Sequence, residues 1–551
     1  MPEKYQLIAE NSDSTVVSDY VSPYQRATSY QSEAELEREL IKQLQAQAYE
    51  YLPIKSETDL IQNLRTQLER LNNYAFTEAE WKRFFAERIA NGNENIADKT
   101  FKIQEDSTQL LQRDNGEVIN IRLLDKTNIH KNCLQVINQY EVSGARDNRY
   151  DVTLLVNGLP LVHIELKRRG VPLKEAFNQI DRYQRDSFWA GSGLFEYVQL
   201  FVISNGTHTK YYSNTTRWQH TNEAGKSDSR RSKKTSHSFE FTSWWADAYN
   251  RPITDLIDFT ATFLSKHTLL SVLTKYCVFT SDKLLLVMRP YQIVATERIL
   301  NRIQIATNYK KLGTIDAGGY VWHTTGSGKT LTSFKTAQLA SKLDYIDKVL
   351  FVVDRKDLDY QTMKEYDKFQ EGAANSNTST RVLTRQLGDP NAKIIITTIQ
   401  KLDTFIKRNQ GHKALDDHMV IIFDECHRSQ FGDMHHAITK SFRNYHLFGF
   451  TGTPIFADNA SSGGRVDLRT TEQAFGDKLH TYTIVDAITD KNVLPFRIDY
   501  IRTIREADEV DDQQKVRDID RERAFVMLCN IYVTILIKKR CVMPNITHLR
   551  G

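Results

Sequence analysis

The sequence predicts a multidomain α/β protein, and three features support this fold class. The chain has 551 residues, which is too many for one hydrophobic core. Before about residue 285, amphipathic helices are followed by alternating strands, which indicates a mixed α/β domain. After it, strands such as 349–355 and 394–400 begin with apolar runs and end in polar residues, as in a parallel sheet covered on both faces.

The composition excludes several classes of protein. The 73 Lys and Arg residues nearly balance the 69 Asp and Glu residues, so net charge neither requires nor excludes a nucleic-acid partner. The five cysteines show no CxxC spacing, which argues against a zinc module or a disulfide framework and fits a reducing cytoplasm. There is no N-terminal signal pattern and no apolar run approaching ~18 residues, so we expect a soluble, cytoplasmic protein without a membrane span.

Helices dominate the first hundred residues, after an N-terminal arm over residues 1–30. Ser32 and Glu35 are spaced as a capping box before a helix with leucines at helical spacing. A second helix is predicted over roughly 57–71, and a third begins after Thr77.

The next segments alternate as strands and include a predicted hairpin. Strands over 118–124 and 133–140 precede a strand over 150–156, which runs into Asn157-Gly158 and a partner strand over 159–166. Asn-Gly between two such strands is a strong signal for a tight turn.

Three polar side chains meet on this hairpin. Asp151 starts the first strand, while Glu165 and Lys167 are two residues apart on the second and project from one face. Two carboxylates can hold Mg²⁺, and the ammonium group can help to activate water or stabilise charge on a scissile phosphate. The pattern predicts a Mg²⁺-dependent nuclease with Asp151 and Glu165 as metal ligands. A structural cross-strand salt bridge would use the same residues, although burying an acid without a partner is costly.

The hairpin resembles the core of the PD-(D/E)xK nuclease family, in which such a hairpin is flanked by helices. On the following helix, Gln179 and Tyr183 are one turn apart and match the Gln-x-x-x-Tyr element that accompanies this core in several nuclease-helicase proteins. The resemblance implies that both residues serve the nuclease site. Glu37 or a neighbour on the first helix is a further candidate ligand for the metal.

The nuclease-like domain is predicted over residues 31–255, and a connecting segment over 256–285 follows it. Further strands are expected over 200–204 and 210–213. Residues 219–238 are polar and basic, and both an exposed connecting loop and a DNA contact fit this composition.

A phosphate-binding pattern lies in the second half of the chain. Residues 323–330, called the phosphate loop below, read His-Thr-Thr-Gly-Ser-Gly-Lys-Thr between a strand end and an apolar-periodic helix. Backbone N–H groups of the turn and the helix N-terminus can cradle an anion, Lys329 can reach the β- and γ-phosphates, and the Thr330 hydroxyl can bind Mg²⁺. The predicted nucleotide-binding residues of the loop are Thr325, Gly326, Ser327, Gly328, Lys329 and Thr330. The alternative is a glycine-rich turn that binds nothing. The usual pattern begins with glycine, and His323 fits there only with ordinary backbone dihedral angles.

Two acids follow another apolar strand, roughly a hundred residues later. Asp424 is expected at the sheet edge beside the phosphate loop, where it can hold the Mg²⁺ of ATP, and Glu425 can polarise the attacking water. A helix N-terminus is the alternative explanation of the pair. Upstream, Arg-Pro-Tyr-Gln ending at Gln292 is similar to the adenine-reading segment of superfamily 2 helicases, and residues 451–454, Thr-Gly-Thr-Pro, are similar to their third motif.

Together these motifs resemble the first RecA-like domain of superfamily 2 helicases, which we place over residues 286–500. With the nuclease core ahead of it, the chain resembles the restriction subunit of type I restriction-modification systems, and the histidine at position 323 is typical of that group. The resemblance implies ATP and Mg²⁺ as cofactors, double-stranded DNA as substrate, ATP-dependent translocation, and methylation and specificity subunits as partners. Another subunit would then select the DNA target.

The C-terminal segment departs from the pattern of this family. A second RecA-like domain, which supplies arginines to the γ-phosphate, is not recognisable after Pro454. We expect residues 501–551 to be a partial linker and an aberrant tail, from an open reading frame truncated by a frameshift near residue 524. Such a chain is expected to bind ATP weakly and hydrolyse it poorly, since arginines of this kind accelerate phosphoryl transfer by about 10³ to 10⁵.

Two other functions stay open. One is a superfamily 2 helicase whose N-terminal domain is only a scaffold, with Asp151, Glu165 and Lys167 in a structural ion-pair network. The other is a non-catalytic assembly fragment that competes for the partner subunits.

Overall fold

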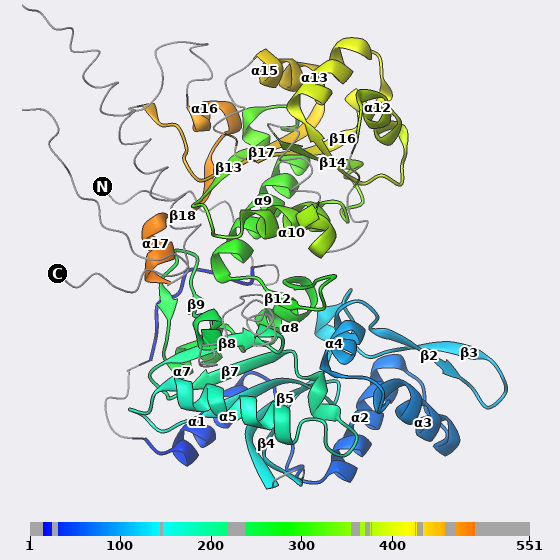
Figure 1. Cartoon of the computed structure of the whole chain (residues 1–551), viewed down its shortest axis with the longest axis vertical. Helices are drawn as coiled ribbons and strands as arrows, with labels where there is room; N and C mark the ends of the chain where they lie inside the picture. The colour runs from blue at the N-terminus through cyan, green and yellow to red at the C-terminus, as the bar shows by residue number, and fades with distance from the viewer. Residues whose placement is uncertain are drawn as a thin grey trace, which may run out of the picture. The chain divides into compact units, whose positions relative to one another are not determined.

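The structure, a computed structural model, contains two six-stranded β-sheets, each with helices packed against it (Figure 1). It describes residues 15–24, 31–143, 147–216, 237–353, 364–369, 375, 377–424, 426, 433–457 and 470–490. Both sheets belong to the same contact-defined unit of the chain. The domain boundaries proposed at residues 255 and 286 stay predictions.

The N-terminal helices begin where the sequence places their caps. The Ser32 hydroxyl accepts a hydrogen bond from the Glu35 N–H, and the Glu35 carboxylate accepts one from the Ser32 N–H, which confirms the capping box. Thr77 and Glu80 form the same reciprocal pair. The helices of this part are α1 (Glu33–Ala46), α2 (Glu57–Asn72), α3 (Glu78–Phe84), its π-helical continuation η1 (Phe85–Ile89) and α4 (Ile96–Gln104).

The first sheet has the strand order β1-β4-β5-β6-β7-β8. Its strands are β1 (Glu50–Tyr51), β4 (Leu134–Ser143), β5 (Asp147–Val156), β6 (Leu159–Leu166), β7 (Leu200–Ser204) and β8 (Thr209–Ser213). β4, β5 and β6 form an antiparallel meander, and β7 runs parallel to β6. Because β5 begins at Asp147, Asp151 lies inside the strand, and the prediction that it starts the strand was wrong.

A two-residue turn joins β5 to β6, as predicted. Asn157 and Gly158 have positive φ angles of 51° and 82°, which a type I′ turn requires. A Cβ atom on Gly158 would lie 2.6 Å from the Cα of Leu64, so glycine also permits close packing against α2. The turn fixes the register of the hairpin.

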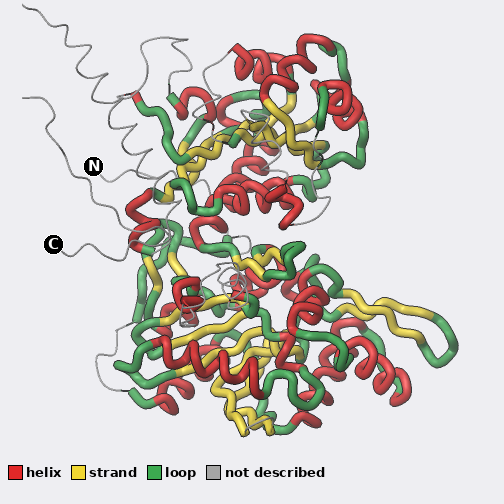
Figure 2. The backbone as a smooth tube through the Cα atoms, in the orientation of Figure 1, coloured by secondary structure: helices red, strands yellow, loops and turns green. Residues whose placement is uncertain are grey.

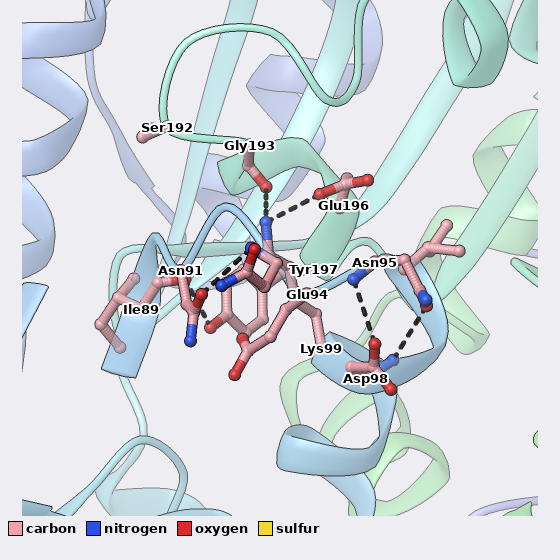
Figure 3. Close-up of polar contacts among 12 residues, drawn as sticks. Ile89, Asn91, Glu94, Asn95, Asp98, Lys99, Ser192, Gly193, Glu196 and Tyr197 are labelled. Carbon is pink, nitrogen blue, oxygen red and sulfur yellow. Dashed lines mark hydrogen bonds and ion pairs between the residues drawn. The ribbon is translucent and has the colours of Figure 1, made fainter. Parts of the chain in front are cut away.

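Helix α5 (Leu173–Asp186) packs on this sheet through a face that includes Phe177 and Ile180. The 3₁₀ turn η3 (Leu194–Tyr197) follows and is fastened to α4 by a buried ion pair. The Lys99 Nζ donates to the Gly193 carbonyl and to the Glu196 carboxylate, each at 2.8 Å (Figure 3). Lys99 is only 2% exposed, so removing its partner would leave a buried charge uncompensated. This pair has a structural role.

A separate hairpin of β2 (Thr108–Gln112) and β3 (Val118–Arg122) projects beyond the helices around it (Figure 1). The sequence predicts only its second strand. The 3₁₀ turn η2 (Ile129–Lys131) precedes β4. Smaller elements connect the two sheets in sequence. They are η4 (His237–Phe241), β9 (Trp245–Ala246), β10 (Pro252–Ile253), α7 (Leu256–Thr262), α8 (Lys266–Lys275), β11 (Cys277–Phe279) and β12 (Leu285–Val287).

The second sheet is parallel throughout, as predicted, with the order β15-β14-β16-β17-β13-β18. Its strands are β13 (Gly319–His323), β14 (Lys348–Val353), β15 (Ile394–Thr398), β16 (His418–Phe423), β17 (Asn444–Thr451) and β18 (Lys478–Tyr482). The accompanying helices are α9 (Pro290–Asn308), η5 (Ile315–Ala317), α10 (Lys329–Ala340), α12 (Thr380–Gly388), α13 (Ile399–Arg408), η6 (Lys413–Leu415), α15 (Asp433–Ser441), α16 (Thr471–Phe475) and α17 (Ile484–Thr489).

Helices cover both faces of this sheet (Figure 2). Along β14, Val349 and Phe351 share one core with α9 and α10, whereas Leu350 and Val352 share another with α12, α13 and α15. Both faces of the strand are therefore buried, which explains why its sequence is apolar at nearly every position.

Several predictions fall on residues that the structure does not describe. They include Glu425, the greater part of the basic segment 219–238, and the C-terminal segment 501–551. No helix in the described ranges is long and apolar enough to cross a membrane.

Candidate functional site

Asp151 and Glu165, called the acid pair below, lie on neighbouring antiparallel strands. Val152 of β5 pairs with Ile164 of β6, so the two acids occupy the next opposed positions. The Leu166 peptide joins them to a lysine. Its N–H donates to Asp151 Oδ2 at 2.9 Å, and its carbonyl accepts from Lys167 Nζ at 2.8 Å. Lys167 Nζ also donates to Glu165 Oε1 at 3.0 Å.

Burial controls the ionisation of the acid pair. Glu165 is fully buried, and burial raises the pKa of both carboxyls to about 7, although the Lys167 charge opposes the shift. The charge of Glu165 raises the pKa of Asp151 further. For Lys167, burial lowers the pKa, but the carboxylates outweigh it and the net pKa is raised. In the absence of a cation, the acid pair therefore holds protons near neutral pH.

A buried histidine, His163, lies next to Glu165 of the acid pair. His163 Nε2 lies 3.5 Å from Glu165 Oε2, and His163 Nδ1 lies 3.2 Å from the Thr153 hydroxyl. Burial lowers the pKa of His163 to about 4, so its ring is neutral at pH 7. His163 is two residues before Glu165 and is not among the site residues predicted from the sequence. Alternation along β6 places His163, Glu165 and Lys167 on one face, and this spacing could have identified it.

The predicted Gln179 and Tyr183 lie on α5 and are joined to each other. The Gln179 amide donates to the Tyr183 hydroxyl, which donates to the Arg149 carbonyl of β5 at 2.9 Å. Burial raises the pKa of Tyr183, and the charges of Glu165 and Asp151 add to this shift. The tyrosine is therefore neutral and lies within the electrostatic range of the acid pair.

On α1, Glu33 rather than Glu37 lies toward the acid pair. Both oxygens of Glu37 accept hydrogen bonds from the β4 side chains of Asn138 and Gln139. Glu33 Oε1 instead lies 3.4 Å from the Arg168 N–H, and its charge raises the pKa of both Glu165 and Lys167. Of the acids on the first helix, Glu33 is thus a better candidate than Glu37 for the additional metal ligand.

The acid pair has the features expected of a site for a divalent cation. Glu165 Oε2 is buried and accepts no hydrogen bond from the described residues, and oxygens are the ligands that Mg²⁺ prefers. Within the described residues, no group of three or more His, Cys, Asp or Glu side chains is placed to share a metal ion. Asp151 and Glu165 are therefore the two carboxylates that this site could offer to a cation.

The phosphate loop connects β13 to α10 and exposes its backbone. Gly326 and Gly328 have φ angles of 83° and 78°, which residues other than glycine rarely adopt. Gly328 is the N-cap of α10, and no side chain of the described residues caps this helix end. Thr325, Gly326 and Gly328 are exposed, so the N–H groups of the first turn of α10 can receive an anion. Lys329 and Thr330 open the helix beside them.

Gln292 lies in the first turn of α9 and contacts the phosphate loop. Its Nε2 donates to the carbonyls of Ser327 and Gly328 at 3.2 and 3.3 Å, and its Oε1 accepts from the Arg289 N–H. Both ends of the amide are thus engaged within the protein, and the adenine-reading role stays a prediction. The neighbouring Tyr291 hydroxyl donates to the Ser327 carbonyl at 2.7 Å.

Asp424 and the phosphate loop lie at the same edge of the parallel sheet. Asp424 follows β16, the loop follows β13, and β17 separates these strands. The turn after β17 lies against the loop, because a Cβ atom on Gly452 would meet Thr325 Oγ1 at 3.4 Å. The Trp322 Nε1 of β13 also donates to the Gly452 carbonyl at 3.1 Å. The Thr-Gly-Thr-Pro motif is therefore next to the predicted nucleotide site.

Two family models match the two parts of the chain. The "Type I restriction enzyme R protein N terminus" matches residues 30–220, and the "SWI2/SNF2 ATPase" matches residues 291–526. The type I restriction enzyme EcoprrI endonuclease subunit of Escherichia coli is 49% identical over 306 residues, which cover 55% of this chain and 93% of that protein. The chain belongs to the type I restriction enzyme endonuclease subunits.

Other members of this endonuclease family match most of the chain. The SauMSSORF170P endonuclease subunit of Staphylococcus aureus (strain MSSA476) is 41% identical over 506 residues, covering 90% of this chain and 50% of the relative. The SsaAORF53P endonuclease subunit of Staphylococcus saprophyticus is 42% identical over 494 residues, covering 88% of this chain and 49% of the relative. The chain spans about half the length of the first curated relatives it matches.

Proposed function

We propose that this endonuclease-family chain serves ATP-dependent translocation on double-stranded DNA and its cleavage, in a complex with methylation and specificity subunits. The proposal rests above all on the acid pair, in which the buried Glu165, the half-buried Asp151 and Lys167 converge through the Leu166 peptide. Residues 31–255 form the proposed endonuclease domain and residues 286–500 a proposed RecA-like motor domain, with 256–285 connecting them.

In the endonuclease domain, Asp151 and Glu165 are the proposed Mg²⁺ ligands. When bound, Mg²⁺ supplies a Lewis acid that polarises the scissile phosphate and lowers the pKa of bound water. His163 stays neutral and supports the Glu165 carboxylate from behind. Glu33 adds negative charge near Lys167.

Lys167 and the α5 residues have supporting roles in this proposal. Lys167 is protonated, because the carboxylates raise its pKa, and its ammonium group can donate to a phosphate oxygen as negative charge develops there. Tyr183, held by Gln179 and by the Arg149 carbonyl, braces β5 beside Asp151 and keeps the acid pair in place.

In the motor domain, the phosphate loop is the proposed ATP site. ATP supplies the phosphoryl group whose hydrolysis drives translocation. The exposed N–H groups around Gly326 and Gly328 would bind phosphate oxygens, and Lys329 would neutralise their charge. The remaining proposed nucleotide-site residues are Gln292, Thr325, Ser327, Thr330 and Asp424, with Thr330 and Asp424 at the Mg²⁺ of ATP and Glu425 as the group that polarises water.

Replacing Asp151 by alanine tests this function. The chain is combined with methylation and specificity subunits, Mg²⁺, ATP and double-stranded DNA that carries their target. We expect Asp151→Ala to lower cleavage by about 10³-fold or more while binding of an ATP analogue is unchanged. Asp147→Ala, at an exposed position of the same strand, is the matched control.

The same experiment separates the competing functions. The Lys167–Glu165 ion pair at 3.0 Å also fits a purely structural network, in which case Asp151→Ala would leave cleavage unchanged. A non-catalytic assembly fragment would join the partner subunits without ATP hydrolysis or cleavage in the unmutated chain.

A further inference from the structure

The histidine at the start of the phosphate loop is fully buried and has a specific partner. His323 replaces the glycine of the usual pattern, and its φ is not among the positive values of the described residues. Its Nε2 lies 2.9 Å from Nδ1 of His480 on β18, and its ring meets the ring of Tyr291 edge to face at 5.4 Å. A glycine could make neither contact.

The two histidine rings are neutral and share one hydrogen bond. Burial lowers the pKa of His323 to about 3, and burial also lowers that of His480. His323 Nε2 and His480 Nδ1 lie 2.9 Å apart, so one of them donates and the other accepts. The backbone of Ala248 acts against the shift of the His480 pKa, so Ala248 lies beside this ring.

β18 contacts the phosphate loop at further positions besides the bond between His480 and His323. The Thr324 N–H donates to the Tyr482 carbonyl at 2.9 Å. The Tyr482 ring stacks on the Tyr291 ring at 3.6 Å, and the Tyr291 hydroxyl holds the Ser327 carbonyl. The two ends of the turn, Thr324 and Ser327, are thus fixed to one strand and its stacked neighbour.

The same strand contacts the N-terminal part of the chain. Asn250 Nδ2 donates to the Thr481 carbonyl at 2.9 Å, and the backbone of Ala248 lies beside the His480 ring. Residues 247–251 form a closed turn, in which Asp247 accepts from the N–H groups of Tyr249 and Arg251. This turn lies within the proposed endonuclease domain. Both the turn at residues 247–251 and the phosphate loop therefore contact β18.

We propose that His323 and His480 are positioning residues that transmit nucleotide binding at the phosphate loop to the turn at residues 247–251. The inference rests on the proposed ATP site. An anion that draws the N–H groups of residues 325–328 toward itself displaces the start of the loop. His323 moves with the loop, and its hydrogen bond passes the displacement to His480. The turn contacts β18 through Asn250, next to His480, so the displacement reaches the turn.

Amide hydrogen exchange of the full chain, with and without a non-hydrolysable ATP analogue and Mg²⁺, tests this coupling. In the unmutated chain we expect the analogue to slow exchange at 478–482 and at 247–251 by about fivefold or more. His323→Gly restores the usual glycine and removes the hydrogen bond to His480, so with the analogue bound it should lose the response at 247–251. His323→Gln keeps an amide that can donate or accept toward His480, and it should restore the response.

Asn250→Gly provides a second variant with little risk to folding. Asn250 has a φ of 62°, which glycine adopts freely, so the substitution removes only the bond to Thr481. We expect a weakened response at 247–251 with normal analogue binding. A full response at 247–251 in His323→Gly that has bound the analogue would overturn the coupling. Failure of the unmutated chain to bind the analogue would overturn the ATP site itself, together with this inference.

Discussion

The acid pair is built from side chains in the interior of a sheet, whereas the phosphate loop is built from exposed backbone. The acid pair places titratable side chains in the interior of a sheet, where Glu165 is fully buried and burial raises the pKa of both carboxyls. The phosphate loop instead exposes backbone N–H groups at a helix end, at glycines with positive φ. The first site depends on charge that the fold must tolerate, and the second depends on backbone shape.

This difference determines how each site responds to change. A buried acid without a cation costs folding free energy, because the interior opposes its ionised form. An exposed helix N-terminus costs little, since water satisfies its N–H groups until an anion arrives. Substitutions in the acid pair should therefore change stability as well as activity, whereas substitutions of charge in the phosphate loop should change ligand affinity alone.

Lys329→Ala should give the largest effect on the phosphate loop. Removing one charge-assisted contact to phosphate costs about 1.5–3 kcal/mol, so we expect the affinity for ATP to fall by about 10²-fold without a change in melting temperature. Equilibrium binding of a fluorescent ATP analogue measures this. Lys342→Ala, at an exposed lysine just after the same helix, is the control. Equal affinities of the two variants would contradict the assignment of the loop.

The features that the sequence predicts correctly are set by neighbouring residues. Asn157 and Gly158 both adopt positive φ, and Ser32 with Glu35 closes a capping box. The parallel sheet is predictable because burial on two faces makes whole strands such as β14 apolar. Each of these signals is complete within a few residues of the chain.

The features that the sequence analysis missed depend on distant partners or weak patterns. His480 lies 157 residues from His323, and nothing local marks it as the partner. Glu33 and Glu37 share a helix, and only the packing of α1 decides which one lies toward Lys167. In β2, only Gln109 and Leu111 are buried, so the strand has too little apolar alternation to be recognised.

Glu33→Gln should have an intermediate effect on the acid pair. Glu33 contributes negative charge beside Glu165 and Lys167, so removing it should weaken cation binding and lower cleavage by about tenfold. Higher Mg²⁺ concentration should restore the rate. Cleavage assays over a Mg²⁺ titration test this, with Glu37→Gln as the matched substitution on the same helix. If Glu37→Gln had the larger, Mg²⁺-reversible effect, the sequence-based choice of Glu37 would be right.

Asp151→Asn should raise the stability of the protein, by an amount that depends on pH. The pKa of Asp151 is about 7 in the folded chain and about 4 when unfolded. Between these values the folded state holds a proton that the unfolded state has lost, so this group's contribution to stability falls as pH rises from about 4 to about 7 and is constant above.

The asparagine variant lacks this titration. Its advantage over the unmutated chain should be small at pH 5 and reach about 1–3 kcal/mol at pH 8. Urea unfolding followed at the two pH values measures it, with Asp147→Asn, at an exposed position of the same strand, as the control. Mg²⁺ at pH 8 should stabilise the unmutated chain and narrow the difference in stability, since the cation neutralises the carboxylate charge that a proton neutralises at lower pH. A stability difference that is the same at both pH values would mean that Asp151 is already ionised without a cation, and the contrast between the two sites would fail.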